Sequence, residues 1–159
     1  MNDHEISKIV ESIVKNIDNT SHEMTLNLAK KLAEKVEAEA KKIGLNVVVA
    51  VSNSAARPVL VECMDDALIA SYDIALNKAY TVVAVKMSTL DLKALTQPNQ
   101  PLYGIQFTND GQIVVFGGGV PLKVNGKIIG GLGVSGGSED QDVYLAEYGA
   151  KAFADLINK

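Results

Sequence analysis

The sequence predicts an α+β domain preceded by a short amphipathic helix. Helix and strand patterns follow the order helix, two strands, helix, two or three strands, helix, and short turns join successive strands. Strands joined by short turns pair antiparallel, so helices should pack on an antiparallel sheet of about five strands. With 159 residues, 47% apolar and 21% charged, the chain has room for one sizeable core.

An amphipathic leader helix is predicted at residues 1–17, followed by a polar linker at 18–23 and the main domain at 24–159. Its apolar residues share one helix face: Ile6, Ile9, Val10, Ile13, Val14 and Ile17. A helix this short is marginal alone, so this face should lie on another surface. Two interpretations stay open: the helix packs on its own domain or a sister subunit, or it docks in another protein's groove.

The main domain is expected to begin with a helix. Thr25 is a suitable N-cap, the apolar spacing continues to Ile43, and Gly44 stands where a C-terminal cap belongs. Apolar runs at 47–51 and 58–63 then predict a hairpin of two strands.

A second long helix is predicted at residues 68–86. The preceding pair Asp65-Asp66 is interpreted as its cap, because acidic residues favour a helix N-terminus. Thr89 is expected to cap a short helix that ends at Leu95. An irregular or one-turn segment should follow at 102–108.

The C-terminal third predicts strands at 112–116, 120–124 and 127–134. Asn125-Gly126 between the last two is a strong hairpin signal, because both central residues of that tight turn favour positive φ. Acidic residues then open a final helix, as the helix dipole prefers.

The glycine-rich stretch 117–142 is the strongest functional signal. Dense glycine beside buried strands indicates tight turns or a close approach of backbone to a ligand or partner. Gly131 to Gly136 also matches G-x-G-x-x-G. A dinucleotide site is not expected, because no parallel strand follows and acidic residues occupy the helix start.

Two side chains invite a catalytic interpretation. Cys63 with His4 or His22 suggests a nucleophile pair, but a free cysteine at a strand end is more often a core residue. Lys78 lies in a largely apolar helix. Either its stem reaches to the surface, or its ammonium points into a cleft toward an anionic ligand.

Composition argues against several classes of partner. The net charge is −4 without a basic block, which disfavours nucleic acid. No run approaches the roughly 20 apolar residues of a membrane span. The N-terminus lacks the apolar core of a secretory signal, and Cys63 is the only cysteine, so we expect a cytoplasmic protein.

An ordered set of motifs resembles the GlcG/HbpS family, which includes the C-terminal domain of the propanediol-utilisation protein PduO. The resemblance runs from about Met24 to the C-terminus and rests on Arg57-Pro58-Val59-Leu60, Ala75-Leu76-Asn77-Lys78-Ala79, Gly118-Gly119-Val120-Pro121-Leu122 and Gly130 to Gly136. It implies a profilin-like fold, homo-oligomers, and haem or a corrinoid-related compound as candidate ligand. Cobalamin adenosylation is not implied, because the resemblance does not extend to an adenosyltransferase domain.

The resemblance and the glycine pattern together give a set of candidate site residues. Expected ligand-binding residues are Asn53, Lys78, Gly118, Gly119, Pro121, Gly133, Ser135 and Gly136. No histidine falls inside the matched domain, so His22, just before it, is the candidate metal ligand for haem. The first hairpin reads Ser52-Asn53-Ser54-Ala55-Ala56 where many relatives have Val-Asp-x-Gly-Gly, which should alter contacts there.

The function expected from these observations is accessory, non-catalytic binding of a small ligand. The leader resembles the encapsulation peptides that carry cargo into bacterial microcompartments, so residues 1–17 should bind a shell protein and place the domain in the microcompartment lumen. One alternative is an enzyme that acts on a small acid or aldehyde through Lys78. Another is a structural module that organises microcompartment enzymes.

Overall fold

The computed structural model describes residues 2–18 and 23–158. These residues form an α+β fold with a four-stranded antiparallel sheet in the order β2-β1-β4-β3, one strand fewer than the approximate five expected. The elements are α1 (Asp3–Asp18), α2 (Leu26–Lys42), β1 (Val48–Asn53), β2 (Pro58–Cys63), α3 (Ser71–Ala84), α4 (Thr89–Leu95), the 3-10 turns η1 (Ile105–Phe107) and η2 (Asn109–Gly111), β3 (Gly119–Val124), β4 (Lys127–Ser135) and α5 (Glu139–Ile157).

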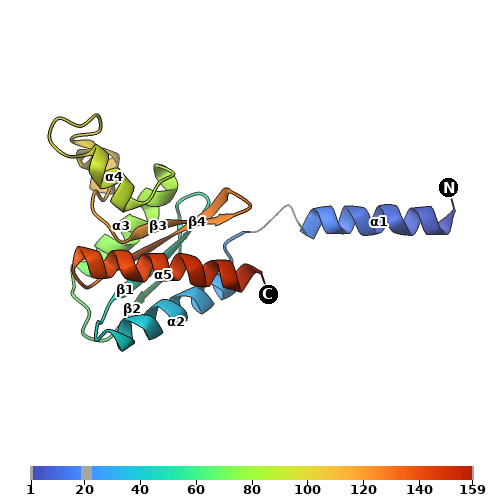
Figure 1. The fold of residues 1–159 in the computed structure, drawn as a ribbon, viewed down its shortest axis with the longest axis horizontal. Coiled ribbons are helices and arrows are strands. Elements are labelled where there is room, and N and C mark those ends of the chain that lie inside the picture. Colours follow the sequence, from blue (N-terminus) through green and yellow to red (C-terminus); the bar gives the residue numbers. More distant parts are fainter. Residues whose placement is uncertain (1, 19–22, 159) are drawn as a thin grey trace.

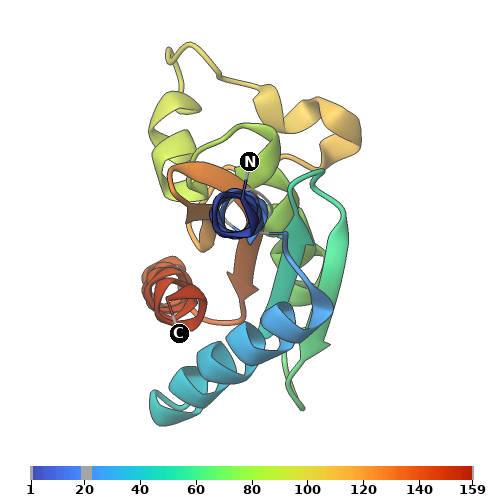
Figure 2. The same cartoon turned by 90° about the vertical axis from the view of Figure 1, so that its right-hand side faces the viewer.

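Helices cover both faces of the sheet. α2 and α5 lie side by side on one face and α3 lies on the other (Figure 1; Figure 2). The larger core lies between the sheet and the α2/α5 layer, where Leu32, Val36 and Leu145 are fully buried. The smaller core joins Val48 and Ala50 to α3.

The central position of β1 in the sheet explains why its sequence is apolar without alternation. Val49 and Val51 belong to the α2/α5 core, whereas Val48 and Ala50 pack against Ala75 and Ala79 of α3. A central strand covered on both faces buries every side chain, so consecutive valines fit it.

β4 lies very close to α3, and its glycines make that approach feasible. A Cβ atom at Gly131 would lie 2.4 Å from the Ala79 carbonyl oxygen, and one at Gly133 would lie 2.0 Å from that of Ala75. The G-x-G spacing therefore places hydrogen atoms against the helix on alternate residues of one strand face. Packing against α3 therefore accounts for the first two glycines of the motif.

Several local predictions are confirmed. The Thr25 hydroxyl accepts the Leu28 N–H at 3.2 Å as the N-cap of α2, and Gly44 adopts φ +73° after its end. Asn125 and Gly126 adopt φ +50° and +79° between β3 and β4, as the hairpin turn requires.

Three local predictions are wrong. Residues 112–116 form no strand, because the Val114 N–H donates to the Thr81 hydroxyl of α3 instead of to a neighbouring strand. α3 begins only at Ser71, and no side chain caps it, so Asp65-Asp66 is not its cap. Ser88, not Thr89, caps α4 and accepts the Asp91 N–H at 3.0 Å.

α1 lies apart from the sheet and its helices (Figure 1). Its apolar side chains Ile6, Ile9, Val10 and Ile13 are 43–51% exposed. The linker prediction at 18–23 falls largely outside the described residues, as does His22. No helix among the described residues has the length and apolarity to cross a membrane.

Candidate functional site

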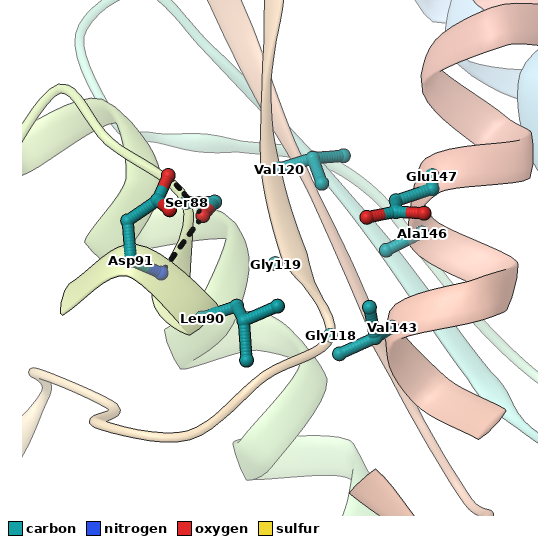
Figure 3. A pocket seen from close by; sticks show the side chains of 9 residues that line it. All are labelled: Ser88, Leu90, Asp91, Gly118, Gly119, Val120, Val143, Ala146 and Glu147. Atoms are coloured by element: carbon teal, nitrogen blue, oxygen red, sulfur yellow. Dashed lines mark hydrogen bonds between the residues drawn. The ribbon is translucent and has the colours of Figure 1, made fainter. Parts of the chain in front are cut away.

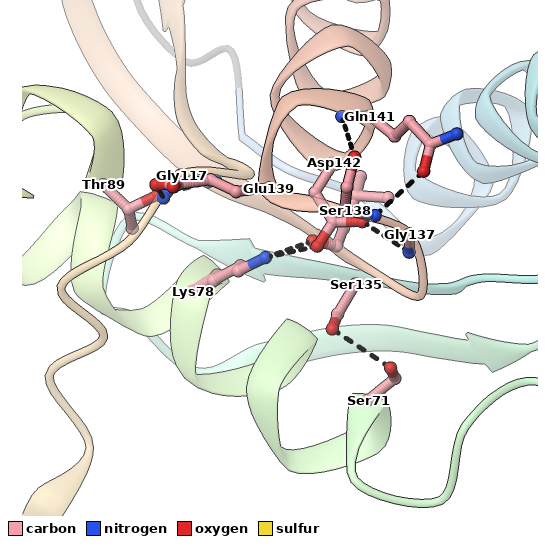
Figure 4. Close-up of polar contacts among 12 residues, drawn as sticks. Ser71, Lys78, Thr89, Gly117, Ser135, Gly137, Ser138, Glu139, Gln141 and Asp142 are labelled. Carbon is pink, nitrogen blue, oxygen red and sulfur yellow. Dashed lines mark hydrogen bonds and ion pairs between the residues drawn. The ribbon is translucent and has the colours of Figure 1, made fainter.

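The centre of the glycine-rich region is a buried ion pair between α3 and α5. The Lys78 side chain is fully buried, and its ammonium donates to Asp142 Oδ2 and to the Val134 carbonyl, both at 2.8 Å (Figure 4). The Phe116 ring centroid lies 4.9 Å from Lys78 Nζ. Burial lowers the pKa of Lys78, while the Asp142 carboxylate acts in the opposite direction.

Asp142 connects this pair to the end of β4. Its second oxygen, Oδ1, accepts the Gly137 N–H at 3.0 Å. Ser138 then starts α5 with a capping box: its hydroxyl accepts the Gln141 N–H, and the Gln141 side chain accepts the Ser138 N–H. The helix start thereby holds the carboxylate in a fixed position under the glycine-rich segment.

Residues 117–119 run directly over Lys78, and each is tied to a neighbouring element. The Gly117 N–H donates to Glu139 Oε1 at 2.7 Å, and the Gly119 N–H donates to the Thr89 hydroxyl at 2.9 Å (Figure 4). Gly118 adopts φ +113°, and a Cβ there would lie 2.5 Å from Lys78 Nζ. Only glycine fits this position, because both the backbone angle and the space forbid a side chain.

Glu139 carries a second link across the same region. Its Oε2 accepts the Lys93 ammonium of α4 at 2.5 Å. The Gly117 N–H first, and then Lys93, lower the pKa of this carboxyl group. α4, the glycine segment and α5 are thus joined at one point.

A pocket of about 270 Å³ opens beside the glycine segment, between α4 and α5 (Figure 3). We call it the β3-edge pocket, because the outer edge of β3 forms its floor. Its lining comprises Ser88, Leu90, Asp91, Gly118, Gly119, Val120, Val143, Ala146 and Glu147. The sequence predicted the backbone part of this pocket, Gly118 and Gly119, and missed the side chains from α4 and α5.

The other expected site residues occupy different places. Gly133 faces α3, and the Ser135 hydroxyl donates to that of Ser71 at 3.1 Å in the same layer. Gly136 abuts residue 46, since its Cβ would lie 2.6 Å from the Asn46 carbonyl. Gly133 and Ser135 therefore belong to the packing of α3, on the opposite side of the sheet from α5, whereas Gly136 packs against the segment that precedes β1.

Two further expected residues lie at the end of β1 and in the edge strand β3. Asn53 shapes the first hairpin, where its Oδ1 accepts the N–H groups of Ala55 and Arg57, both at 3.0 Å. The Val-Asp-x-Gly-Gly departure therefore leaves an asparagine that still closes the turn. Pro121 is half-buried in the edge strand β3.

A second pocket, of about 350 Å³, was not anticipated. We call it the Cys63 pocket; it is lined by Glu37, Lys41, Asn46, Cys63, Met64 and Asp65. Cys63 is exposed, whereas the Met64 sulfur accepts the Val47 N–H at 3.4 Å. Burial, followed by the nearby Glu62, raises the pKa of Glu37. The only sequence signal was a cysteine at a strand end.

The two pockets differ in whether their lining residues could bind haem. The β3-edge pocket offers no imidazole, thiol or thioether and no cation for the propionates. The Cys63 pocket offers a thiol and a thioether, both known types of axial haem ligand, and the cation Lys41. At 350 Å³ it lies at the lower end of ligand pockets, so it would hold only part of a macrocycle. Among the described residues, no group of three or more His, Cys, Asp or Glu side chains could hold a bare metal ion.

Comparison with known proteins agrees with this architecture. The family model described as haem degrading protein HbpS-like matches residues 24–151. An uncharacterised 15.0 kDa protein from the dhaT–dhaS intergenic region of Citrobacter freundii is 46% identical over 133 residues, which cover 84% of this chain and 94% of the relative. The crystal structure of the PduOC:heme complex has a TM-score of 0.79 at 35% identity, covering 82% of this chain and 94% of that one.

Corrinoid adenosyltransferase PduO of Salmonella typhimurium is also similar, at 40% identity over 108 residues. The match covers 68% of this chain but only 32% of PduO, so the chain spans about a third of that relative.

The four-stranded antiparallel sheet and its helical layers define an α+β domain of the class to which the PduOC structure belongs. The chain belongs to the HbpS-like family.

Proposed function

We propose that this protein is a haem-binding accessory protein that works as a homo-oligomer. The observation that carries the proposal is the 35% identity and TM-score of 0.79 to the PduOC:heme complex over 94% of that chain. A corrinoid-related compound is the second ligand to test, because PduO is a corrinoid adenosyltransferase. The proposal assigns no catalytic step to the domain.

The Cys63 pocket is where the described residues best fit haem. Cys63 would supply a thiolate, and Lys41 a counter-charge for a propionate. Because the pocket is open and small, the rest of the macrocycle would lie against a second subunit, which links haem binding to oligomer formation. His22 remains the alternative ligand, as the only histidine close in sequence to the domain.

Haem titration followed by absorbance tests this proposal. The wild type should give a Soret shift, and Cys63→Ser or His22→Ala should change its position, depending on which residue ligates the iron. His4→Ala is the matched control and should leave the spectrum unchanged. Absence of any Soret shift with the wild type would refute haem binding, and the same titration with cobalamin tests the corrinoid.

We further propose that α1 directs the domain into the lumen of a bacterial microcompartment within the cytoplasm by binding a shell protein. The support is that its apolar face is exposed and that the family match begins only at residue 24. By its spacing, Lys8 lies on the face of the helix opposite the apolar side chains. α1 carries four acidic residues and two lysines, and this net negative charge favours a protein groove over an anionic membrane surface.

Deletion of residues 1–17 tests the role of α1. A fluorescent fusion of the truncated chain should lose co-localisation with the shell, while size-exclusion chromatography should show an unchanged oligomer. Ile9→Glu should act like the deletion, whereas Lys8→Glu on the opposite face should not. Loss of the oligomer on deletion would show that α1 belongs to the subunit interface instead.

A second candidate function, catalysis on a small aldehyde or acid through Lys78, is favoured by one observation. The lowered pKa of Lys78 increases the share of neutral amine, the form that attacks a carbonyl. Its side chain, however, is fully buried beneath Gly118, so the glycine segment would have to open. Borohydride reduction with propionaldehyde should then label Lys78 specifically; labelling of surface lysines alone would exclude this function.

A further inference from the structure

The β3-edge pocket presents hydrogen-bond acceptors and negative charge to a ligand. Asp91 and Glu147 are exposed at its rim, and neither forms an ion pair within the described part of the chain. The Ser88 hydroxyl donates to Asp91 Oδ2 at 2.7 Å, and no donor among the described residues contacts the other carboxylate oxygen (Figure 3). No lysine, arginine or histidine is among the lining residues.

The floor of the pocket adds backbone acceptors. The Val134 N–H donates to the Gly118 carbonyl at 2.8 Å, so Gly118 and Val134 form a hydrogen-bonded pair of the antiparallel ladder. Because such pairs alternate, the N–H and C=O of the next residue, Gly119, point to the outer edge of β3. Thr89 accepts that N–H, and no described hydrogen bond uses the Gly119 carbonyl.

Pro121 makes a strand an unsuitable occupant of this edge. By the same alternation its backbone nitrogen faces outward, and proline has no N–H to donate to an added strand. The nearest buried cation, Lys78, is neutralised by Asp142 and closed off by Gly118. Lys93 of α4, the other cation near the glycine segment, is paired with Glu139 and does not line the pocket. The lining of the pocket therefore offers carbonyl oxygen and carboxylate.

The walls limit the shape of the ligand. Leu90 and Val143 point toward the pocket from α4 and α5, with Ala146 beside them (Figure 3). Apolar walls around a few polar groups are typical of small-molecule sites. A volume of about 270 Å³ suits a compound of a few carbon atoms.

From this geometry we infer that the β3-edge pocket binds a small primary ammonium compound. The carboxylates of Asp91 and Glu147 and the carbonyl of Gly119 accept its N–H groups. Its alkyl body lies against Leu90 and Val143. This site is separate from the Cys63 pocket and does not depend on haem binding.

Titration of ¹⁵N-labelled full-length protein with propylammonium tests the inference. The amide signals of Leu90, Gly119 and Val143 should shift in a saturable manner, with a Kd on the order of 10⁻⁴–10⁻² M for so small a ligand. Propionate and 1-propanol, matched in size, should not shift these signals at the same concentrations. Added salt should weaken the binding of propylammonium.

Two charge-removing variants locate the site. Glu147→Gln and Asp91→Asn should each weaken propylammonium binding about tenfold, as loss of a charge-assisted hydrogen bond predicts. Both side chains are exposed, so the fold should persist, which the unshifted remainder of the spectrum would verify. Asp155→Asn, another exposed carboxylate of α5, should bind like the wild type.

Equal binding by Glu147→Gln and the wild type would overturn the inference. So would shifts of the same amides by propionate, or the absence of saturable shifts at the pocket up to about 50 mM, well above the expected Kd. Haem titration of Glu147→Gln separates the two proposals, because it should retain the wild-type Soret response.

Discussion

The Lys78 side chain is fully buried, and its charge is balanced inside the protein. Asp142 and the Val134 carbonyl accept two of its three N–H groups, and the Phe116 ring lies near the ammonium. Such a pair contributes little net stability over apolar residues of similar size, but removal of one partner leaves an uncompensated charge.

Asp142→Asn should therefore lower the free energy of unfolding by about 3–5 kcal/mol. Urea denaturation measures this change. Lys93→Met is the matched control: it breaks the partly exposed Lys93–Glu139 pair and should cost only about 0–1 kcal/mol. Similar losses in the two variants would mean that the Lys78–Asp142 pair is not effectively buried.

The burial of Lys78 predicts that stability depends on pH in the alkaline range. The pKa of Lys78 is lowered from 10.5, chiefly by burial. Between the lowered pKa and 10.5 the unfolded chain binds more protons than the folded one, so the free energy of unfolding rises with pH there. The wild type should gain stability relative to Lys78→Met as the pH approaches 10.5; parallel profiles would contradict the lowered pKa.

At the scale of elements, β4 and α3 pack closely because β4 has glycines, without side chains, where it faces the helix. Gly133 lets the Ala75 backbone approach to a distance that no side chain tolerates. Helix–sheet contact there is backbone against backbone, and such a contact cannot be relieved by a change of rotamer.

Gly133→Ala should accordingly destabilise the protein by about 3 kcal/mol or more, at the upper end of overpacking effects. Gly44→Ala is the control, since its Cβ would meet open space and only the φ of +73° is strained. It should cost about 1–2 kcal/mol. Thermal or urea unfolding of both variants gives the comparison, and equal costs would argue that α3 can shift away from β4.

The elements also show which parts of the fold local sequence patterns can predict. Helix periodicity, the Thr25 cap and the Asn125-Gly126 turn are local signals, and each is confirmed. The strand expected at 112–116 failed because its backbone partner is the Thr81 side chain, 33 positions from Val114. No local sequence pattern indicates a hydrogen-bond partner that is so far away along the chain.

At the candidate site, the sequence predicted glycine backbone near Lys78 but not its surroundings. Gly118 and Gly119 line the β3-edge pocket, whereas Asp91 and Glu147 come from helices whose surface acids look ordinary in sequence. Asp142 is one of the acidic residues that open the final helix, and only the tertiary structure pairs it with Lys78. Pairings between distant elements are the part that one sequence leaves open.

For the whole molecule, α1 and the domain should be energetically separate. The apolar side chains of α1 that the structure describes are exposed, so they add no buried area to the core. Deletion of residues 1–17 should leave the free energy of unfolding of the remaining chain within about 0.5 kcal/mol of the wild type. A larger loss in urea denaturation would show that the helix packs on the domain.

The strand order has a consequence for how this protein folds during its synthesis on the ribosome. β1 is central, and its second neighbour is β4, which is translated some 80 positions later. Until then the β1–β2 hairpin carries an open edge and an uncovered apolar face, the kind of surface that nascent-chain chaperones protect. Productive collapse must therefore await nearly the entire polypeptide, and ribosome stalling before β4 would leave an aggregation-prone fragment.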